Sequence, residues 1–239
     1  KTNSLGIMTS DSIFNAITSI EVSSFERASD LKVLPDGGYI LVGSKFATDT
    51  NYDVWLVKLD ADLNVVFTQT YDNGGDDFGY SVSLCDDNGF IIAGKTYATG
   101  GYDMWVLKTD AVGELVASDS FGTNGKITIG SNDANDAAYS VHQTDDGGYI
   151  IAGETQSYGS GGNDMMLVKL AADGLYASNF GDTDLDGSAA TFEATVIGGP
   201  LNESAKFVQE TSDNSFIIVG DSYSYGSGQS DIYIVEVNS

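Results

Sequence analysis

The chain has 239 residues, of which 10 are Lys or Arg and 35 are Asp or Glu, so its formal net charge at pH 7 is −25. Such a chain repels nucleic-acid phosphates and anionic membrane surfaces, which excludes both as partners. Its apolar residues, 41% of the total, are enough to form a core, and no apolar run approaches the roughly 18 residues of a membrane-spanning helix. We therefore expect a folded protein that does not insert into membranes.

The first predicted element is a single β-strand at residues 13–22, which precedes the repeated part of the chain. This segment is mostly apolar and has no neighbouring strand of its own. We assign residues 1–25 to a separate N-terminal segment that supplies this strand to the rest of the fold.

From residue 26 onward, one sequence unit occurs four times. In each unit a turn of Asp, Asn and Gly is followed by an aromatic residue that opens an Ile- or Val-rich strand, and an Asp then opens a second apolar strand. The aromatic residues are Tyr39, Phe90, Tyr149 and Phe216, and the opening acids are Asp53, Asp103, Asp164 and Asp231. Repeats of this length are typical of solenoids, propellers and arrays. The predicted units are residues 26–76, 77–134, 135–202 and 203–239.

Each unit is predicted to form short strands separated by tight turns, with a fourth, outer strand after a second Asp-rich turn. The outer strands are expected at residues 65–68, 115–118 and 175–178. The middle strands are apolar at successive positions, so both of their faces should be buried, as in sheets stacked face to face. We therefore predict an all-β fold, a β-propeller of four blades, each a four-stranded antiparallel sheet.

The fourth unit ends at Ser239 without room for its outer strand. Because an unpaired sheet edge favours aggregation, we expect residues 13–22 to complete this blade and close the ring. The alternative is that the same strand is donated to a neighbouring molecule, which would build a filament of subunits.

Three segments resemble the bacterial "delta-sixty" tandem repeats of secreted and cell-surface proteins. They are FGTNGKITI at residues 121–129, NDAAYSV at 135–141 and DGGYIIAG at 146–153. The resemblance covers about residues 26–239 and is strongest in residues 121–170. It implies an exported β-propeller and no catalytic motif. The Phe-Gly element occurs clearly once, at Phe121, and residues 179–182 hold a broken copy.

One segment, DTDLDGSAATFE at residues 182–193, fits the calcium-loop pattern with acids at alternate positions, a Gly and a distal Glu. Calcium takes six to eight oxygen ligands, which this pattern supplies. The predicted ligands are Asp182, Asp184, Asp186, the carbonyl of Ser188, and Glu193. The other interpretation is a solvated acidic loop between the third and fourth units.

The loops before the Asp-led strands are rich in Tyr, Ser, Gly and Asn, which form adaptable recognition surfaces. This composition predicts a ligand site at Tyr102, Tyr158, Asn163 and Tyr225, where a Tyr ring can stack on a sugar. The more conservative interpretation is flexible hairpin loops. The four opening acids are expected to cap turns by accepting backbone N–H bonds.

The inventory for catalysis is thin, because His142 is the sole histidine and Cys85 the sole cysteine. Cys85 aligns with Leu34, Thr144 and Thr211 in the other units, which indicates a packing residue. We therefore expect a non-enzymatic, extracellular or cell-surface module with a structural or adhesive role, stabilised by Ca²⁺, with a protein or glycan ligand at the loop rim. The alternatives are a lectin, and a filament subunit that self-associates through residues 13–22.

Overall fold

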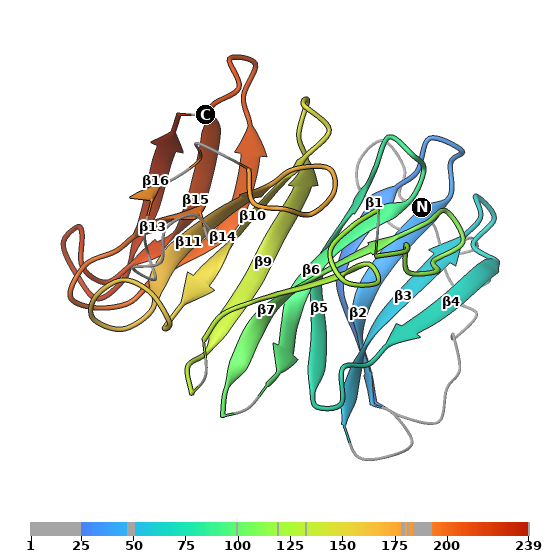
Figure 1. The fold of residues 1–239 in the computed structure, drawn as a ribbon, viewed down its shortest axis with the longest axis horizontal. Helices are drawn as coiled ribbons and strands as arrows, with labels where there is room; N and C mark the ends of the chain where they lie inside the picture. The colour runs from blue at the N-terminus through green and yellow to red at the C-terminus, as the bar shows by residue number, and fades with distance from the viewer. Residues whose placement is uncertain are drawn as a thin grey trace, which may run out of the picture.

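The computed structural model describes residues 25–46, 51–98, 100–118, 120–131, 133–177, 180, 182–183 and 193–238. The predicted strand at residues 13–22 and residues 184–192 of the predicted calcium loop lie outside this set. Every regular element of the described residues is a β-strand, and the strands form four antiparallel sheets (Figure 1). The all-β prediction is confirmed at this level. In the described part of the chain, no helix is long and apolar enough to cross a membrane.

The four sheets follow one another in chain order. The first contains β1 (Glu26–Val33), β2 (Tyr39–Phe46), β3 (Tyr52–Leu59) and β4 (Val65–Tyr71). The second contains β5 (Asp77–Leu84), β6 (Phe90–Tyr97), β7 (Tyr102–Thr109) and β8 (Lys126–Ile129). The third contains β9 (Asp136–Gln143), β10 (Tyr149–Thr155), β11 (Asp164–Leu170), β13 (Glu193–Ile197) and the short β12 (Asp182–Thr183). The fourth contains β14 (Glu203–Glu210), β15 (Phe216–Ser222) and β16 (Asp231–Val237).

The turn between the first two strands has the same structure in all four units. In the first unit the Gly37 N–H donates to the Leu34 carbonyl, and the Asp36 carboxylate accepts from the Gly38 N–H at 2.9 Å. The turn requires a positive φ at one position, which Gly adopts without strain and Asn tolerates. That position holds Gly37, Asn88, Gly147 and Asn214, with φ of 83°, 64°, 83° and 66°. The recurring Asp-Gly and Asp-Asn pairs of the sequence therefore encode this turn.

Consecutive sheets pack face to face, with a hydrophobic cluster between the members of each pair. Successive residues of a strand point to opposite faces, so Ile91 contributes to the cluster shared with the third sheet and Ile92 to the cluster shared with the first. The same alternation places Ile150 toward the fourth sheet and Ile151 toward the second. The unbroken apolar runs of β6 and β10 are thus explained by burial on both faces.

The fourth sheet differs, because the described residues pack against only one of its faces. Phe216 and Ile218 are buried against the third sheet, but Ile232 and Ile234 on the opposite face are 81% and 63% exposed. Phe207 on β14 is 68% exposed. Within the described part of the chain, no strand pairs with the outer edge of β16. As far as the structure describes the chain, the fourth sheet therefore presents both an open edge and an apolar face.

The prediction of the outer strands is correct in the first unit and wrong in the next two. Residues 65–68 lie in β4, but Leu115 and Tyr176 of the other two predicted strands make isolated bridges, and the outer strands there are β8 and β13. In both units an inserted segment carries a phenylalanine into a core. Phe121 packs edge-on against Tyr149 of the third sheet at 5.5 Å, and Phe180 packs against Phe216 of the fourth at 5.6 Å. Burial of these rings takes up the residues after the turn, so the outer strand begins later.

Candidate functional site

The innermost strands of neighbouring sheets are linked by a repeated hydrogen bond. Each first strand pairs with a register shift, between Ala28 and Asp30 in the first sheet and at the equivalent place in the others, so one N–H beyond it is free to bond outside its own sheet. The acceptor is a side chain of the preceding sheet. The bonds run from the Val82 N–H to Asp30 at 3.1 Å, from Val141 to Ser81 at 3.3 Å, and from Val208 to Ser140 at 3.3 Å. We call this series the inner-strand relay.

A second repeated bond joins the loops at the rim of the junctions. The donor is a backbone N–H at or next to the start of an Asp-led strand. The acceptor is the side chain of the residue that directly precedes the first strand of the next sheet. The bonds run from the Tyr52 N–H to Asp76 at 2.9 Å, from Tyr102 to Asn135 at 3.2 Å, and from Asn163 to Asn202 at 2.9 Å. We call these contacts the rim clasps. They hold each loop to the sheet that follows it.

Carboxylates meet beneath each rim clasp. The opening acids of the Asp-led strands face the acids that begin the next sheet, in the pairs Asp53 with Asp77, Asp103 with Asp136, and Asp164 with Glu203. Burial, and to a smaller extent the charges of Asp72 and Asp53, raise the pKa of Asp77 to about 6. Burial and the Asp136 charge likewise raise the pKa of Asp103. The junctions therefore concentrate negative charge in partly buried positions.

The opening acids are expected to cap turns by accepting backbone N–H bonds. Such a bond is found at Asp164, and for Asp53 and Asp103 this role stays a prediction. The Asp164 carboxylate accepts the Ser160 N–H at 2.7 Å in the loop before its strand. Asp164 is fully buried, and burial raises its pKa.

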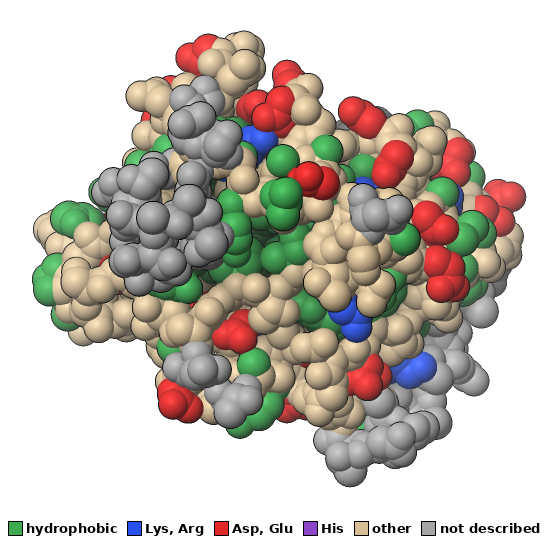
Figure 2. All heavy atoms as spheres, viewed as in Figure 1, with side chains coloured by type: hydrophobic (Ala, Val, Ile, Leu, Met, Phe, Trp, Pro, Cys, Tyr) green, Lys and Arg blue, Asp and Glu red, His purple; other side chains and the backbone are tan. Residues whose placement is uncertain are grey.

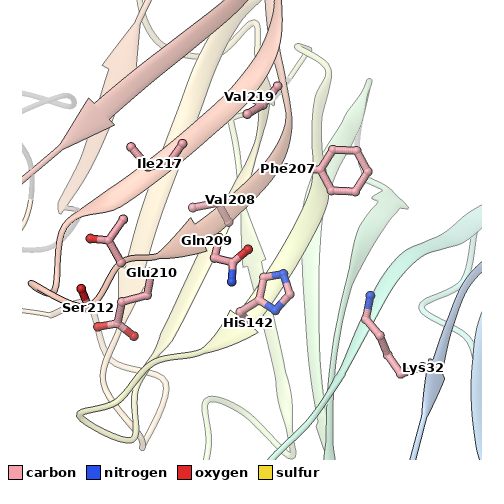
Figure 3. Close-up of a pocket in the computed structure, with 10 residues that line it drawn as sticks. Lys32, His142, Phe207, Val208, Gln209, Glu210, Ser212, Ile217 and Val219 are labelled. Carbon is pink, nitrogen blue, oxygen red and sulfur yellow. The ribbon is translucent and has the colours of Figure 1, made fainter.

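A groove opens between the first strands of the first, third and fourth sheets. Its volume is about 790 Å³, and it is lined by Lys32 of β1, His142 of β9 and residues of β14 and β15, including Phe207, Gln209 and Glu210 (Figure 3). Phe207, Gln209 and His142 lie on one side, and Lys32 lies across from them. Burial and the Lys32 charge lower the pKa of His142. The lining of the groove therefore includes both apolar and polar side chains.

On the face shown in Figure 2, acidic side chains are widely spread and basic ones are few. Part of the acidity is structural. Lys58, Lys108 and Lys169 occupy the same position of the Asp-led strand and each reaches an acid of the first turn, at 3.8, 2.7 and 2.7 Å. Lys108 and Lys169 are buried. Each of these ion pairs links an Asp-led strand to the first turn of the same sheet. The fourth unit has Glu236 at this position.

Of the predicted ligand residues, Tyr102 begins β7, Tyr158 and Asn163 share the loop between β10 and β11, and Tyr225 lies in the loop between β15 and β16. The structure gives most of them partners within the protein. The Tyr225 ring stacks on Tyr233 at 5.3 Å and its hydroxyl donates to the Gly198 carbonyl at 2.7 Å. The Asn163 side chain accepts from Gln156 at 2.7 Å, and Tyr158 packs against the core between the second and third sheets. Tyr102 lines a surface hollow of about 530 Å³ beside Tyr97, and the Lys95 ammonium lies 4.0 Å from the centre of its ring. Their role in ligand binding stays a prediction.

The predicted calcium loop is described only at its ends. Asp182 and Glu193 lie in β12 and β13, which pair antiparallel with Thr183 opposite Glu193. The predicted ligands Asp184, Asp186 and Ser188 are outside the described residues. The backbone therefore brings the two ends of the loop together, and calcium binding there stays a prediction.

Cys85 and His142 occupy different environments. Cys85 is buried among apolar residues of the second and third sheets, and burial raises the pKa of its thiol to about 12. His142 lines the groove, and no hydrogen bond between it and Cys85 is found among the described residues. The packing role expected for Cys85 fits this position.

Three sets of repeated residues were not recognised from the sequence: the relay acceptors, the acids that begin the first strands, and the lysines of the Asp-led strands. All of them recur at fixed positions in the repeat, so a column-by-column comparison that included polar residues could have found them. Comparisons with known proteins add no assignment, because no family model and no curated protein matches this chain.

Proposed function

We propose that the chain is a non-enzymatic interaction module of the β-propeller type, extracellular or displayed on the cell surface, with a structural or adhesive role. The observation that carries this proposal is the stack of sheets that ends in an incomplete fourth sheet. The relay, the rim clasps and the hydrophobic clusters make the stack rigid, and a rigid frame presents surface loops without a large ordering cost.

Residues 13–22 are the segment that we assign to the open edge of β16. In the first three sheets, the last residue of the outer strand pairs with the residue after the opening Asp, as Tyr71 does with Val54. Ile129 and Ile197 pair in the same way with Met104 and Met165. Tyr71 and Ile197 also stand six residues before the acid of the next first strand. Counting back equally from Glu26 gives Ile20, which would then pair with Ile232.

Closure of the ring within one molecule would bring the fourth unit against the first, and this junction lacks two of the contacts that hold the others. Phe207 replaces the relay acceptors Asp30, Ser81 and Ser140, and Phe25 replaces the clasp acceptors Asp76, Asn135 and Asn202. A phenyl ring accepts neither bond. The open edge of β16 also fits a second candidate function, in which the strand is donated to a neighbouring molecule and the protein is a filament subunit. The junction between a fourth and a first sheet would then form between two chains.

The extracellular location rests on the resemblance of residues 121–153 to repeats of exported proteins. The partner class is a protein or glycan ligand at the loop rim. A lectin is the less favoured alternative, because the ring and hydroxyl of Tyr225 already have partners inside the protein.

The experiment that tests the proposal measures the mass of the intact chain and of a deletion of residues 1–24 by light scattering during size-exclusion chromatography. If the ring closes on itself, the intact chain is monomeric and the deletion, with its open β16 edge, associates or melts at a lower temperature. If the strand is donated, the intact chain forms polymers and the deletion gives monomers. Identical mass and melting temperature for the two proteins would overturn both versions.

A further inference from the structure

The junction between the first and second sheets holds three carboxylates. Asp53 lies at the start of β3, Asp72 directly follows β4, and Asp77 is the first residue of β5. One carboxylate oxygen from each residue lies within 4.8 Å of the other two. The three acids therefore come from both sheets and from the loop that connects them.

The third carboxylate is a feature of this junction and not of the repeat. The residue that follows the outer strand is Asp72 in the first unit, Gly130 in the second and Gly198 in the third. At the other two junctions the space beside this residue is filled by an opening acid, so that a side chain on Gly130 would collide with Asp103 and one on Gly198 with Asp164. The first junction alone of these three thus places a third acid where the others have glycine.

Asp77 supplies an independent indication of a missing ligand. It is fully buried, and its Oδ2 accepts the Asn73 N–H at 2.7 Å, but its Oδ1 has no hydrogen-bond partner. A buried, unpaired carboxylate oxygen is costly, and a bound cation removes that cost. Lys126 reaches the backbone carbonyl of Asp72 at 3.1 Å, and among the described residues no ion pair includes the carboxylate of Asp72 or Asp77.

We propose that Asp53, Asp72 and Asp77 bind a divalent cation, Ca²⁺. Calcium–oxygen bonds are about 2.3–2.6 Å long, so ligand oxygens on one ion lie up to about 5 Å apart, which the triad satisfies. Calcium also takes more ligands than three carboxylates offer and accepts water at the remaining positions. Asp72 lines the hollow that contains Asn51, Gly75 and Tyr102, so solvent and the ion reach the triad from the surface.

The site would tie the first sheet to the second, since Asp53 belongs to one and Asp77 to the other. It is separate from the predicted loop at residues 182–193, which lies in the third unit. It also does not depend on how residues 13–22 are used, so it stands or falls independently of the proposed function.

The test is calorimetric titration of CaCl₂ into EDTA-treated, dialysed full chain, together with melting curves with and without CaCl₂. All proteins carry Asp184→Asn and Asp186→Asn, so that the predicted loop does not contribute. The background protein is compared with the same protein carrying Asp72→Asn, and with a control carrying Asp133→Asn. Asp133 is an exposed acid in the loop of the next junction, so the control changes the net charge equally.

We expect the background protein and the Asp133→Asn control to bind one Ca²⁺ and to melt about 5 °C higher at saturation. Asp72→Asn should weaken binding at least tenfold, and in EDTA it should melt no lower than the background because it removes a repulsive charge. The proposal is overturned if the background protein binds no Ca²⁺ at about 10 mM, where extracellular sites are saturated. It is equally overturned if Asp72→Asn binds as tightly as the control.

Discussion

The substitution Ser140→Ala tests whether the inner-strand relay holds the third and fourth sheets together. Ser140 is 2% exposed, and its hydroxyl oxygen accepts the Val208 N–H at 3.3 Å. Alanine leaves this buried N–H without a partner, and the loss of one partner of a buried hydrogen bond costs about 1–3 kcal/mol. For a chain of this size, that range corresponds to a fall in Tm of about 2–12 °C.

Urea denaturation followed by tryptophan fluorescence measures the effect, since Trp105 is buried in the core between the first and second sheets. Ser83→Ala is the matched control. Ser83 also lies on a first strand, but its hydroxyl makes only a 3.5 Å contact with the Leu84 carbonyl next to it. We expect the control to change the free energy of unfolding by less than about 0.5 kcal/mol. If Ser140→Ala is no less stable than Ser83→Ala, the relay does not contribute to stability and the reasoning is wrong.

Three further predictions concern charge, the thiol and the acidic loop. Burial raises the pKa of Asp146, but hydrogen bonds from Lys169 and Thr144 outweigh it and lower the pKa to about 2. Wild type should therefore be more stable than Asp146→Asn above about pH 4, and this difference should disappear as the pH falls to about 2. Because the Asp146 side chain is 65% exposed, the difference in the free energy of unfolding, measured in urea titrations, should not exceed about 1 kcal/mol. A difference that grows on acidification would contradict this. Cys85 should resist a thiol reagent at pH 8 in the folded chain and react fully in denaturant, because burial raises its pKa to about 12; rapid labelling of folded protein would show that the site opens. If the Asp72→Asn variant still melts at a higher temperature in calcium, that rise in Tm should vanish when Asp184→Asn and Asp186→Asn are added. A rise that persists in the triple variant would show that the predicted loop at residues 182–193 is not its source.

The sheets and turns could be predicted from the sequence because the sequence unit is repeated. Aromatic residues such as Phe90, acids such as Asp103, and Asp-Gly or Asp-Asn pairs recur at fixed positions, and each position has one structural role. The two wrong outer strands arose where the repeat is interrupted. Residues 115–118 have the apolar composition of a strand, but burial of Phe121 against the third sheet outweighs it. The composition of residues 115–118 does not show that the Phe121 ring packs against another sheet.

The junction carboxylates were harder to predict for a different reason. Asp53, Asp72 and Asp77 are unremarkable in a chain with 35 acids, and each fits the turn chemistry around it. Their proximity depends on how β3, β4 and β5 are placed by the stacking of two sheets. The relay acceptors were missed because the register shift that frees the N–H of Val208 is a property of strand pairing and leaves no sequence signal beyond a small polar residue.

The central claim is that residues 13–22 complete the fourth sheet at the edge of β16, and a pair of engineered cysteines tests it most directly. In the register that the other sheets follow, residue 20 lies opposite residue 232, as Tyr71 lies opposite Val54. Directly opposed strand residues have Cα atoms about 4.5–5.5 Å apart, which a disulfide can bridge. Cys85 is buried and should not compete.

We expect the variant with Ile20→Cys and Ile232→Cys to form a disulfide on mild oxidation, within one chain if the ring closes on itself and between chains if the strand is donated. Non-reducing electrophoresis and peptide mapping distinguish the two products. The offset pair Ile17→Cys and Ile232→Cys serves as the control and should stay reduced. If the first pair crosslinks no faster than the offset pair, residues 13–22 do not occupy this edge, and the account of the fourth sheet is contradicted.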